Sequence, residues 1–444
     1  MRVKWVISVI LLIHLTGGVI FAQGSSQPLT LEESIRIALA KSLDLYSNAE
    51  GIAGSEFRRR AAYTGFLPKW SGQYSYSRSN TPSLGGGAGG ANGTGSTGGG
   101  NVVDSRNVFN LSTSIRQPVY AGGSISSNYR LEKIGVDISR TDAEVTRREV
   151  VLQVREGYFN ILNTLKQRDV AEQQVKLTEA QLEVTKAFFE VGIQPKNDVL
   201  LAEVQLANAR QDLVRRENEV IRAKSSFNTL LRREIDEPLD LVDILTYKPF
   251  PLRFEDSVQE AHRERPELRN AEFSIMQEKE RVKIARSGYF PTVDLTGSYS
   301  RSSEEAHLYG DIRTERWSFQ TLASITFWEW GRTGYQVGES KVRVNQAEIA
   351  RVKLIEGITF EVKNAYIDLQ VAERNIRVTE KATEQAEENL RMNEERYKYQ
   401  VATQTEVLNA VTLLAQARRD YYDALSGFNI AKARLEQTMG RMYP

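Results

Sequence analysis

Long stretches of the chain carry apolar residues at every third or fourth position. In one of them the apolar positions are Val151, Val154, Tyr158, Ile161 and Leu165. This spacing puts the apolar side chains on one face of a helix, and the pattern continues in heptads typical of long packed helices. A helix of about 65 residues would be about 100 Å long at 1.5 Å per residue. We therefore predict two long helical hairpins, at 124–232 and 333–440.

Four shorter stretches alternate between apolar and polar residues. In the first, Trp70, Gly72, Tyr74 and Tyr76 alternate with Lys69, Ser71, Gln73 and Ser75. A period of two is typical of a strand with one apolar and one polar face. We predict strands at about 67–79, 107–120, 290–301 and 315–328.

The same series of elements occurs twice. The segment "TGFLPKWSGQYSYSRS" at 64–79 returns, altered, as "SGYFPTVDLTGSYSRS" at 287–302. Such self-similarity is typical of a tandem duplication. We assign repeat 1 to 23–250 and repeat 2 to 251–444, and we interpret the Gly-rich segment 85–100, which repeat 2 lacks, as a surface loop.

Each repeat is expected to open with a helix, at about 29–62 and 252–286. The first begins with Thr30 followed three residues later by Glu33, a spacing typical of a capping box at a helix N-terminus.

The N-terminus has the pattern of a secretory signal peptide. Arg2 and Lys4 precede an apolar run at about 5–15, and small residues lead to Ala22. We predict a signal peptide at 1–22 with cleavage after Ala22. A membrane anchor helix is the alternative, although the apolar run is short for a span of about 20 residues.

Composition excludes several classes of protein. The chain contains 58 Lys and Arg residues and 57 Asp and Glu residues, which gives a net charge of +1. A charge so close to zero argues against a nucleic-acid partner. The absence of cysteine excludes disulfides, thiolate metal sites and catalytic thiols. The three histidines, His14, His262 and His307, have no spacing typical of a metal site. We expect no catalytic residues, no metal and no cofactor, and therefore no enzyme.

The predicted strands match transmembrane β-strands in length and pattern. Four strands would leave two open edges, whose unpaired backbone groups are costly in lipid, so the sheet must close with other copies. Two copies would give eight strands and a filled interior, and three would give twelve strands and a lumen. The polar inner face favours three copies.

The duplicated order of elements resembles the TolC-type outer membrane efflux proteins. The resemblance includes "YFPTVDLTGSY" and the tip residues Phe189, Gly192, Asp198, Val199, Leu200 and Ala202. It implies an α+β membrane protein: a homotrimer with a 12-stranded β-barrel, four strands per chain, continuous with a long periplasmic α-helical barrel. The implied location is the outer membrane of a Gram-negative type envelope, in contact with its lipid.

The implied function is that of an exit duct in a tripartite export system. The resemblance implies passive conduction of substrates from a periplasmic adaptor protein and an inner membrane pump of RND, ABC or MFS type. The alternative from another class is a secreted or periplasmic coiled-coil scaffold or adaptor. A scaffold would need no aromatic-faced strands of membrane length.

The resemblance also implies site residues at the tips of the hairpins. A periplasmic gate is implied at Asp198, Glu406, Asn409 and Tyr397, and adaptor-binding surfaces at Val191, Gly192, Ile193, Val401, Ala402 and Thr403. A ring of carboxylates in a narrow pore favours cations. For Asp198 and Glu406, stabilisation of a helix N-terminus is an alternative role of equal weight.

Three tip residues depart from the family pattern. Asn409 is neutral where a second acid often stands, Ala402 occupies the place of a latch arginine, and Gln400 replaces the hinge glycine of the second tip. We expect a gate that is weaker or differently connected.

Overall fold

The computed structural model describes residues 28–82, 103–306 and 312–441. Two sequence predictions, the signal peptide at 1–22 and the loop at 85–100, fall outside these ranges.

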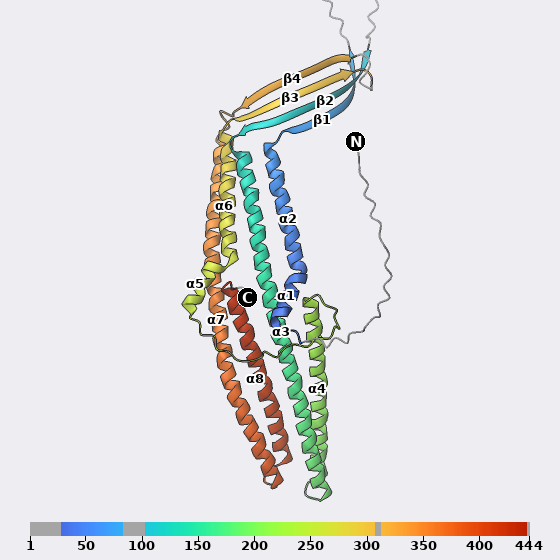
Figure 1. Ribbon diagram of the computed structural model, residues 1–444, viewed down its shortest axis with the longest axis vertical. Helices are drawn as coiled ribbons and strands as arrows, with labels where there is room; N and C mark the ends of the chain where they lie inside the picture. Colours follow the sequence, from blue (N-terminus) through green and yellow to red (C-terminus); the bar gives the residue numbers. More distant parts are fainter. Residues whose placement is uncertain (1–27, 83–102, 307–311, 442–444) are drawn as a thin grey trace, which may run out of the picture.

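Both repeats fold into the same series of elements (Figure 1). Repeat 1 contains α1 (Leu31–Lys41), α2 (Leu43–Tyr63), β1 (Lys69–Pro82), β2 (Val103–Ala121), α3 (Ser124–Glu190) and α4 (Lys196–Leu230). Repeat 2 contains α5 (Phe254–Glu264), α6 (Pro266–Arg286), β3 (Thr292–Ser303), β4 (Ile312–Ser324), α7 (Arg332–Lys398) and α8 (Gln404–Thr438). Helices α3 and α7 each have 67 residues, and α4 and α8 each have 35. The internal repeat is confirmed.

The segments at about 29–62 and 252–286 are helical as predicted, but each is divided into two helices by one extended residue. Ser42 separates α1 from α2 in an extended conformation, and its hydroxyl accepts a hydrogen bond from the amide of Leu45. Arg265 separates α5 from α6 and is also extended. It precedes Pro266, and the proline ring disfavours the helical conformation in the preceding residue.

The four strands form one antiparallel sheet in the order β1-β2-β3-β4. The two repeats meet where β2 pairs with β3, and β1 and β4 are the outer strands. Figure 1 shows the sheet projecting from one end of the long helices. Strand β4 ends at Ser324, before Trp328 and Trp330, which lie in the connection to α7.

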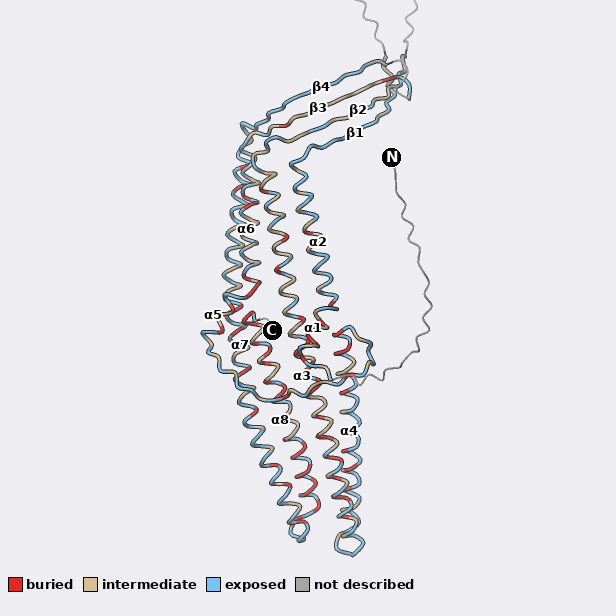
Figure 2. The backbone as a smooth tube through the Cα atoms, in the orientation of Figure 1, coloured by how far each residue is buried: buried red, intermediate tan, exposed pale blue. Residues whose placement is uncertain are grey.

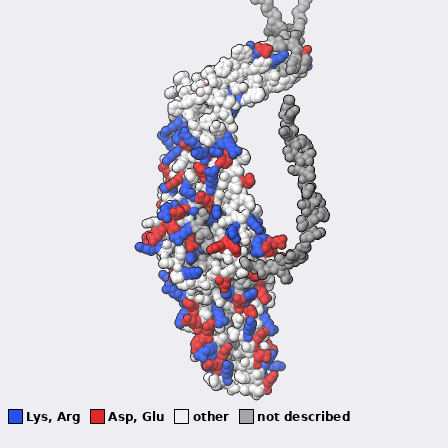
Figure 3. All heavy atoms as spheres, in the orientation of Figure 1, with Lys and Arg blue, Asp and Glu red and all other residues white. Residues whose placement is uncertain are grey.

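One face of the sheet is apolar and aromatic. The register places Trp70 opposite Ile115, Tyr74 opposite Leu111 and Tyr299 opposite Trp317. Trp70 and Trp317 are 80% and 78% exposed in the single chain. Figure 3 shows almost no charged side chains over the middle of the sheet, whereas positively and negatively charged side chains occur all along the helices. Such a face requires an apolar environment.

The opposite face of the sheet is polar. Serine hydroxyls meet across neighbouring strands, with Oγ atoms 2.9 Å apart at Ser71 and Ser114 and 2.8 Å apart at Ser298 and Ser318. The polar face suits contact with water.

The long helices form two hairpins, α3 with α4 and α7 with α8 (Figure 1). Helix α3 also packs against α8, which joins the hairpins, while α2 and α6 pack beside the upper parts of α3 and α7. Over the described ranges, the helices contain no segment long and apolar enough to cross a membrane.

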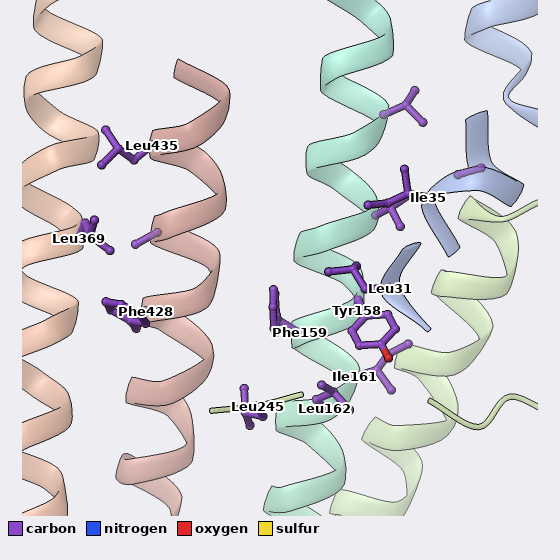
Figure 4. Close-up of a cluster of buried hydrophobic side chains, with 14 of the residues drawn as sticks. Leu31, Ile35, Tyr158, Phe159, Ile161, Leu162, Leu245, Leu369, Phe428 and Leu435 are labelled. Carbon is purple, nitrogen blue, oxygen red and sulfur yellow. The ribbon is translucent and has the colours of Figure 1, made fainter. Parts of the chain in front are cut away.

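The main core lies at the middle of the molecule, where buried positions gather in Figure 2. It includes Leu31, Tyr158, Phe159 and Phe428, drawn in Figure 4. The buried hydroxyl of Tyr158 lies 2.7 Å from the carbonyl oxygen of Val242 and 3.1 Å from that of Leu29, and donates to both. The segment that joins the two repeats is thereby fastened to α3.

Candidate functional site: the helix tips

The two hairpin tips have the same backbone geometry. Helix α3 ends in a turn with Gly192 at φ 78°, and α7 ends in a turn with Gln400 at φ 62°. Only glycine adopts this left-handed conformation without steric cost. The second tip therefore forms the hinge turn without the hinge glycine.

Glu406 caps the N-terminus of α8. Its carboxylate accepts a hydrogen bond of 2.6 Å from the Thr403 amide, and the Thr403 hydroxyl accepts one of 3.3 Å from the Glu406 amide. The bond from the Thr403 amide lowers the pKa of the exposed Glu406 carboxyl below its ordinary value. The helix-stabilising role is present in this geometry, and the predicted role in the gate stays a prediction.

Tyr397 lies between the two hairpins. It belongs to α7 but is buried against α3, with its hydroxyl 3.3 Å from the Thr185 hydroxyl and its ring centroid 5.6 Å from that of Phe188. Burial raises the pKa of the Tyr397 hydroxyl, and the negative charge of Asp198 adds to the rise. Tyr397 therefore connects the two hairpins near their tips, and its role as a latch stays a prediction.

The other two predicted gate residues lie at the starts of the returning helices. Asp198 is half-buried in the first turn of α4, which begins after Pro195 without a side-chain cap. Asn409 is exposed on α8. The Asp198 charge thus acts on the pKa of the Tyr397 hydroxyl, while Asn409 is exposed in the single chain.

The predicted adaptor-binding residues divide into exposed and buried. Val191 and Val401 are 69% and 65% exposed, and Ile193 and Gly192 are exposed beside them. Thr403 is also exposed, as the N-cap of α8. Ala402 is buried in the apolar cluster of α7 and α8, so its prediction as a surface contact is wrong for the single chain.

One contact at the tips was not predicted. The Gln181 side chain on α3 donates a hydrogen bond of 2.8 Å to the Gln404 side chain on α8, and both are buried. The sequence carried one signal of it: Gln167, Gln174 and Gln181 recur every seventh position, and in a packed helix that spacing keeps side chains on one face.

The tips hold no arrangement typical of a catalytic centre. Across the described part of the chain, no group of three or more Asp, Glu, His or Cys residues could hold a metal ion. The tips instead contain two turns with exposed apolar side chains, the carboxylates of Asp198 and Glu406, and the hydrogen bond between Gln181 and Gln404 that joins the hairpins.

Comparison with known proteins identifies the family of the chain. A family model described as Outer membrane efflux protein matches residues 35–231 and 257–441, one stretch in each repeat. The outer membrane protein TolC of Escherichia coli (strain K12) is 21% identical over 324 residues, covering 70% of this chain and 65% of that protein. The chain thus spans slightly less than two thirds of the length of that relative.

The likeness extends over the whole fold. The outer membrane efflux protein BepC of Brucella suis biovar 1 is 20% identical over 429 residues, covering 96% of this chain and 89% of that protein. The crystal structure of CusC, a transmembrane channel, superposes with a TM-score of 0.78 at 18% identity, covering 93% and 92% of the two chains. The crystal structure of the CmeC outer membrane channel of Campylobacter jejuni superposes with a TM-score of 0.76 at 16% identity, covering 92% of this chain and 85% of that chain. These relatives are named as outer membrane proteins and channels rather than as enzymes, and the chain belongs to the outer membrane efflux protein family.

Proposed function

We propose that three copies of this chain form a channel that conducts substrates passively across the outer membrane. The observation that carries the proposal is the four-stranded sheet, which is apolar on one face and polar on the other and whose outer strands β1 and β4 each leave one edge unpaired in the single chain. In lipid these edges must be paired. Twelve strands, four from each copy, leave a lumen lined by the polar face.

As a member of this family, the chain is an outer membrane protein with a periplasmic helical part. The family match favours a channel over a coiled-coil scaffold, and the relatives named above are efflux proteins and channels. We infer that the protein acts in an export system without catalysing a reaction and without a resident cofactor.

The helix tips form the periplasmic gate in this proposal. Asp198 and Glu406, repeated by threefold symmetry, place carboxylates around the narrow end of the helical barrel. A ring of negative charge attracts cations and repels anions. The contact of Tyr397 with Thr185 and Phe188 supports a latch that holds the tips together.

A periplasmic adaptor is the proposed partner at the tips. The exposed apolar side chains Val191, Ile193 and Val401 next to the two turns support such a docking surface. Energy would come from an inner membrane pump, of RND, ABC or MFS type, through the adaptor. Outward rotation of the inner helices on docking would then widen the passage.

Single-channel recording in planar bilayers tests the channel and its gate. The wild-type protein should give discrete conductance steps with preference for cations. Asp198→Ala combined with Glu406→Ala should raise the conductance and lower the preference for cations, because the charged ring is removed. The matched control is Asp198→Glu, which keeps the charge. Currents unchanged in the double variant would contradict the gate assignment.

A further inference from the structure

Four basic side chains lie where the long helices meet the sheet. Arg60 is near the end of α2, and Arg286 is the last residue of α6. Lys133 and Lys341 lie near the starts of α3 and α7. Figure 3 shows Lys and Arg side chains gathered at these helix ends, next to the uncharged middle of the sheet. We call these four residues the basic collar.

The basic collar is a surplus of positive charge. The carboxylates at the same level each form an ion pair with a neighbouring Arg or Lys, and these are Glu56, Glu132, Glu278, Glu280, Glu329 and Glu339. The four collar side chains are exposed and form no ion pair with another described residue. Arg60 instead has an uncharged neighbour, with its guanidinium carbon 5.8 Å from the centroid of the Phe57 ring. The collar is therefore available to an anionic partner outside the chain.

Both repeats contribute to the collar. Lys133 lies ten residues after Gly123, the N-cap of α3, and Lys341 lies ten residues after Gly331, the N-cap of α7. Helices α2 and α6 supply one arginine each. In three copies of the chain these positions would recur around the whole circumference, as a surface surrounded by lipid requires.

An aromatic cluster in repeat 1 shows on which side of the helices the collar lies. The ring centroids of Tyr63 and Tyr129 are 6.1 Å apart, and the Phe66 ring packs on both, at 5.9 and 6.2 Å. Arg60 precedes Tyr63 by three residues. Lys133 follows Tyr129 by four, and both spacings keep side chains on one face of a helix. Aromatic side chains at the ends of membrane strands are typical of the level of the lipid head groups.

Repeat 2 has a matching arrangement. Tyr289 is 55% exposed, and a Cβ added at Gly334 of α7 would lie 3.3 Å from its hydroxyl. Lys341 follows Gly334 by seven residues, which puts it on the same face of α7. Arg286 precedes Tyr289 by three residues at the end of α6. The collar thus lies beside exposed aromatic rings in both repeats.

The distances fit the head-group layer of a membrane. Arg60 is about 4.5 Å from Tyr63 along α2, and Lys133 is about 6 Å from Tyr129 along α3, at 1.5 Å per residue. The head-group layer adds about 5–8 Å on each side of the hydrocarbon core. Long Lys and Arg side chains can also extend toward head groups, whose phosphates accept strong hydrogen bonds from them.

We propose that the basic collar binds the head groups of anionic phospholipids in the periplasmic leaflet of the outer membrane and so fixes the depth of the sheet in the bilayer. Charge complementarity supports this partner, because clustered Lys and Arg beside a membrane attract anionic lipid. The inference depends on the sheet lying in the outer membrane and not on conduction through the channel.

Lipid retention in native mass spectrometry tests the collar. The full-length protein in a neutral detergent is incubated with equal amounts of phosphatidylglycerol and phosphatidylcholine, which carry the same acyl chains and differ in head-group charge. The wild type should retain at least fivefold more phosphatidylglycerol. Incubation at high salt should reduce this preference, because exposed charges are screened. Equal retention of the two lipids at low salt would overturn the proposal.

The collar variant replaces all four residues by glutamine. Arg60→Gln, Lys133→Gln, Arg286→Gln and Lys341→Gln together should lower the preference below twofold. The replaced side chains are exposed, so the variant should assemble as the wild type does. A collar variant that keeps the wild-type preference would contradict the proposal.

Two control variants separate the collar from net charge and from side-chain shape. Exchange of Arg for Lys and of Lys for Arg at the four collar positions keeps the charge and should keep the preference. The second control changes four exposed basic residues farther from the sheet to glutamine: Lys41, Arg222, Lys248 and Arg374. This control should also keep the preference, and a loss equal to that of the collar variant would assign the effect to net charge and overturn the proposal.

Inorganic phosphate distinguishes a lipid head group from a free anion. Added phosphate should displace no more phosphatidylglycerol than sodium chloride of the same ionic strength does. Stronger displacement by phosphate would assign the collar to a free anion and contradict the proposal.

Conductance separates the collar from the proposed channel. The collar variant should conduct as the wild type does once it is inserted in a planar bilayer. A wild type that conducts but retains both lipids equally would overturn the collar and leave the channel standing. A wild type that retains phosphatidylglycerol selectively but gives no conductance would overturn the channel and support the collar.

Discussion

Gln400 adopts a left-handed backbone conformation that favours glycine. It occupies the place in the second tip that Gly192 occupies in the first, with φ 62° against 78°. The left-handed conformation costs a residue with a side chain roughly 1 kcal/mol relative to glycine. The sequence revealed the substitution, but only the structure shows that the turn keeps its geometry in spite of it.

Gln400→Gly should therefore stabilise the second tip by about 1 kcal/mol. Amide hydrogen exchange in the tip should slow about fivefold. The reverse change, Gly192→Ala, should speed exchange at the first tip by a similar factor. No heavy atom lies within 4 Å of the added methyl group, so the backbone angle is the only cause. Equal exchange in Gln400→Gly and the wild type would contradict this explanation.

Glu406 makes the start of α8 sensitive to acid. Since capping lowers its pKa in the folded chain, the carboxylate contributes stability above its ordinary pKa. That stability is lost as the pH falls from the ordinary pKa of the carboxyl through the lower pKa that it has in the folded chain. Amide exchange in the first turn of α8, corrected for intrinsic rate, should show reduced protection at acid pH.

Glu406→Gln is the control for this prediction. A glutamine can also accept the capping hydrogen bond but does not titrate. Protection of the first turn of α8 in this variant should vary less with pH than in the wild type. An equal acid response in both proteins would assign the effect to other groups.

At the scale of elements, hydrophobic periodicity predicted the types of element well. The alternation around Trp70 and the three-to-four spacing around Val154 correspond to β1 and α3. The breaks at Ser42 and Arg265 were missed because apolar periodicity continues across a kink of one residue. Pro266 was a usable signal, since the residue before a proline avoids the helical conformation.

Tyr158 fastens an element that periodicity alone does not place. The segment between α4 and α5 has no regular helix. The Tyr158 hydroxyl contacts the carbonyl of Val242 within it and the carbonyl of Leu29, which forms an isolated β-bridge with Leu241 of the segment. Tyr158→Phe removes this donor from the Val242 carbonyl, at a cost of about 1–2 kcal/mol, whereas the Leu29 carbonyl still accepts from the Val242 amide at 3.2 Å. Amide exchange and limited proteolysis between residues 231 and 253 should increase at least fivefold.

Tyr366 is the matched control in repeat 2. It contributes its ring, which packs on Phe254 with centroids 5.8 Å apart. Tyr366→Phe keeps that ring and should leave proteolysis unchanged. A similar response to both substitutions would show that the hydroxyl of Tyr158 does not carry the attachment.

At the scale of the whole molecule, the duplication explains the architecture. Two copies of one series of elements give one sheet and two hairpins in each chain, joined at the β2–β3 pairing and at the α3–α8 contact. The sequence predicted this plan because the repeated segments are recognisable. It could not predict the contacts between hairpins, which depend on how two helices distant in sequence are rotated toward each other.

The four-stranded sheet is incomplete in one chain. The apolar face with Trp70 and Trp317 exposed, together with the unpaired outer edges of β1 and β4, requires lipid on one side and further copies at the edges. Native mass spectrometry of the full-length protein, purified from membranes in detergent, measures this requirement directly. We predict an assembly of three chains that needs detergent to stay in solution. A single chain that remains soluble without detergent would contradict it.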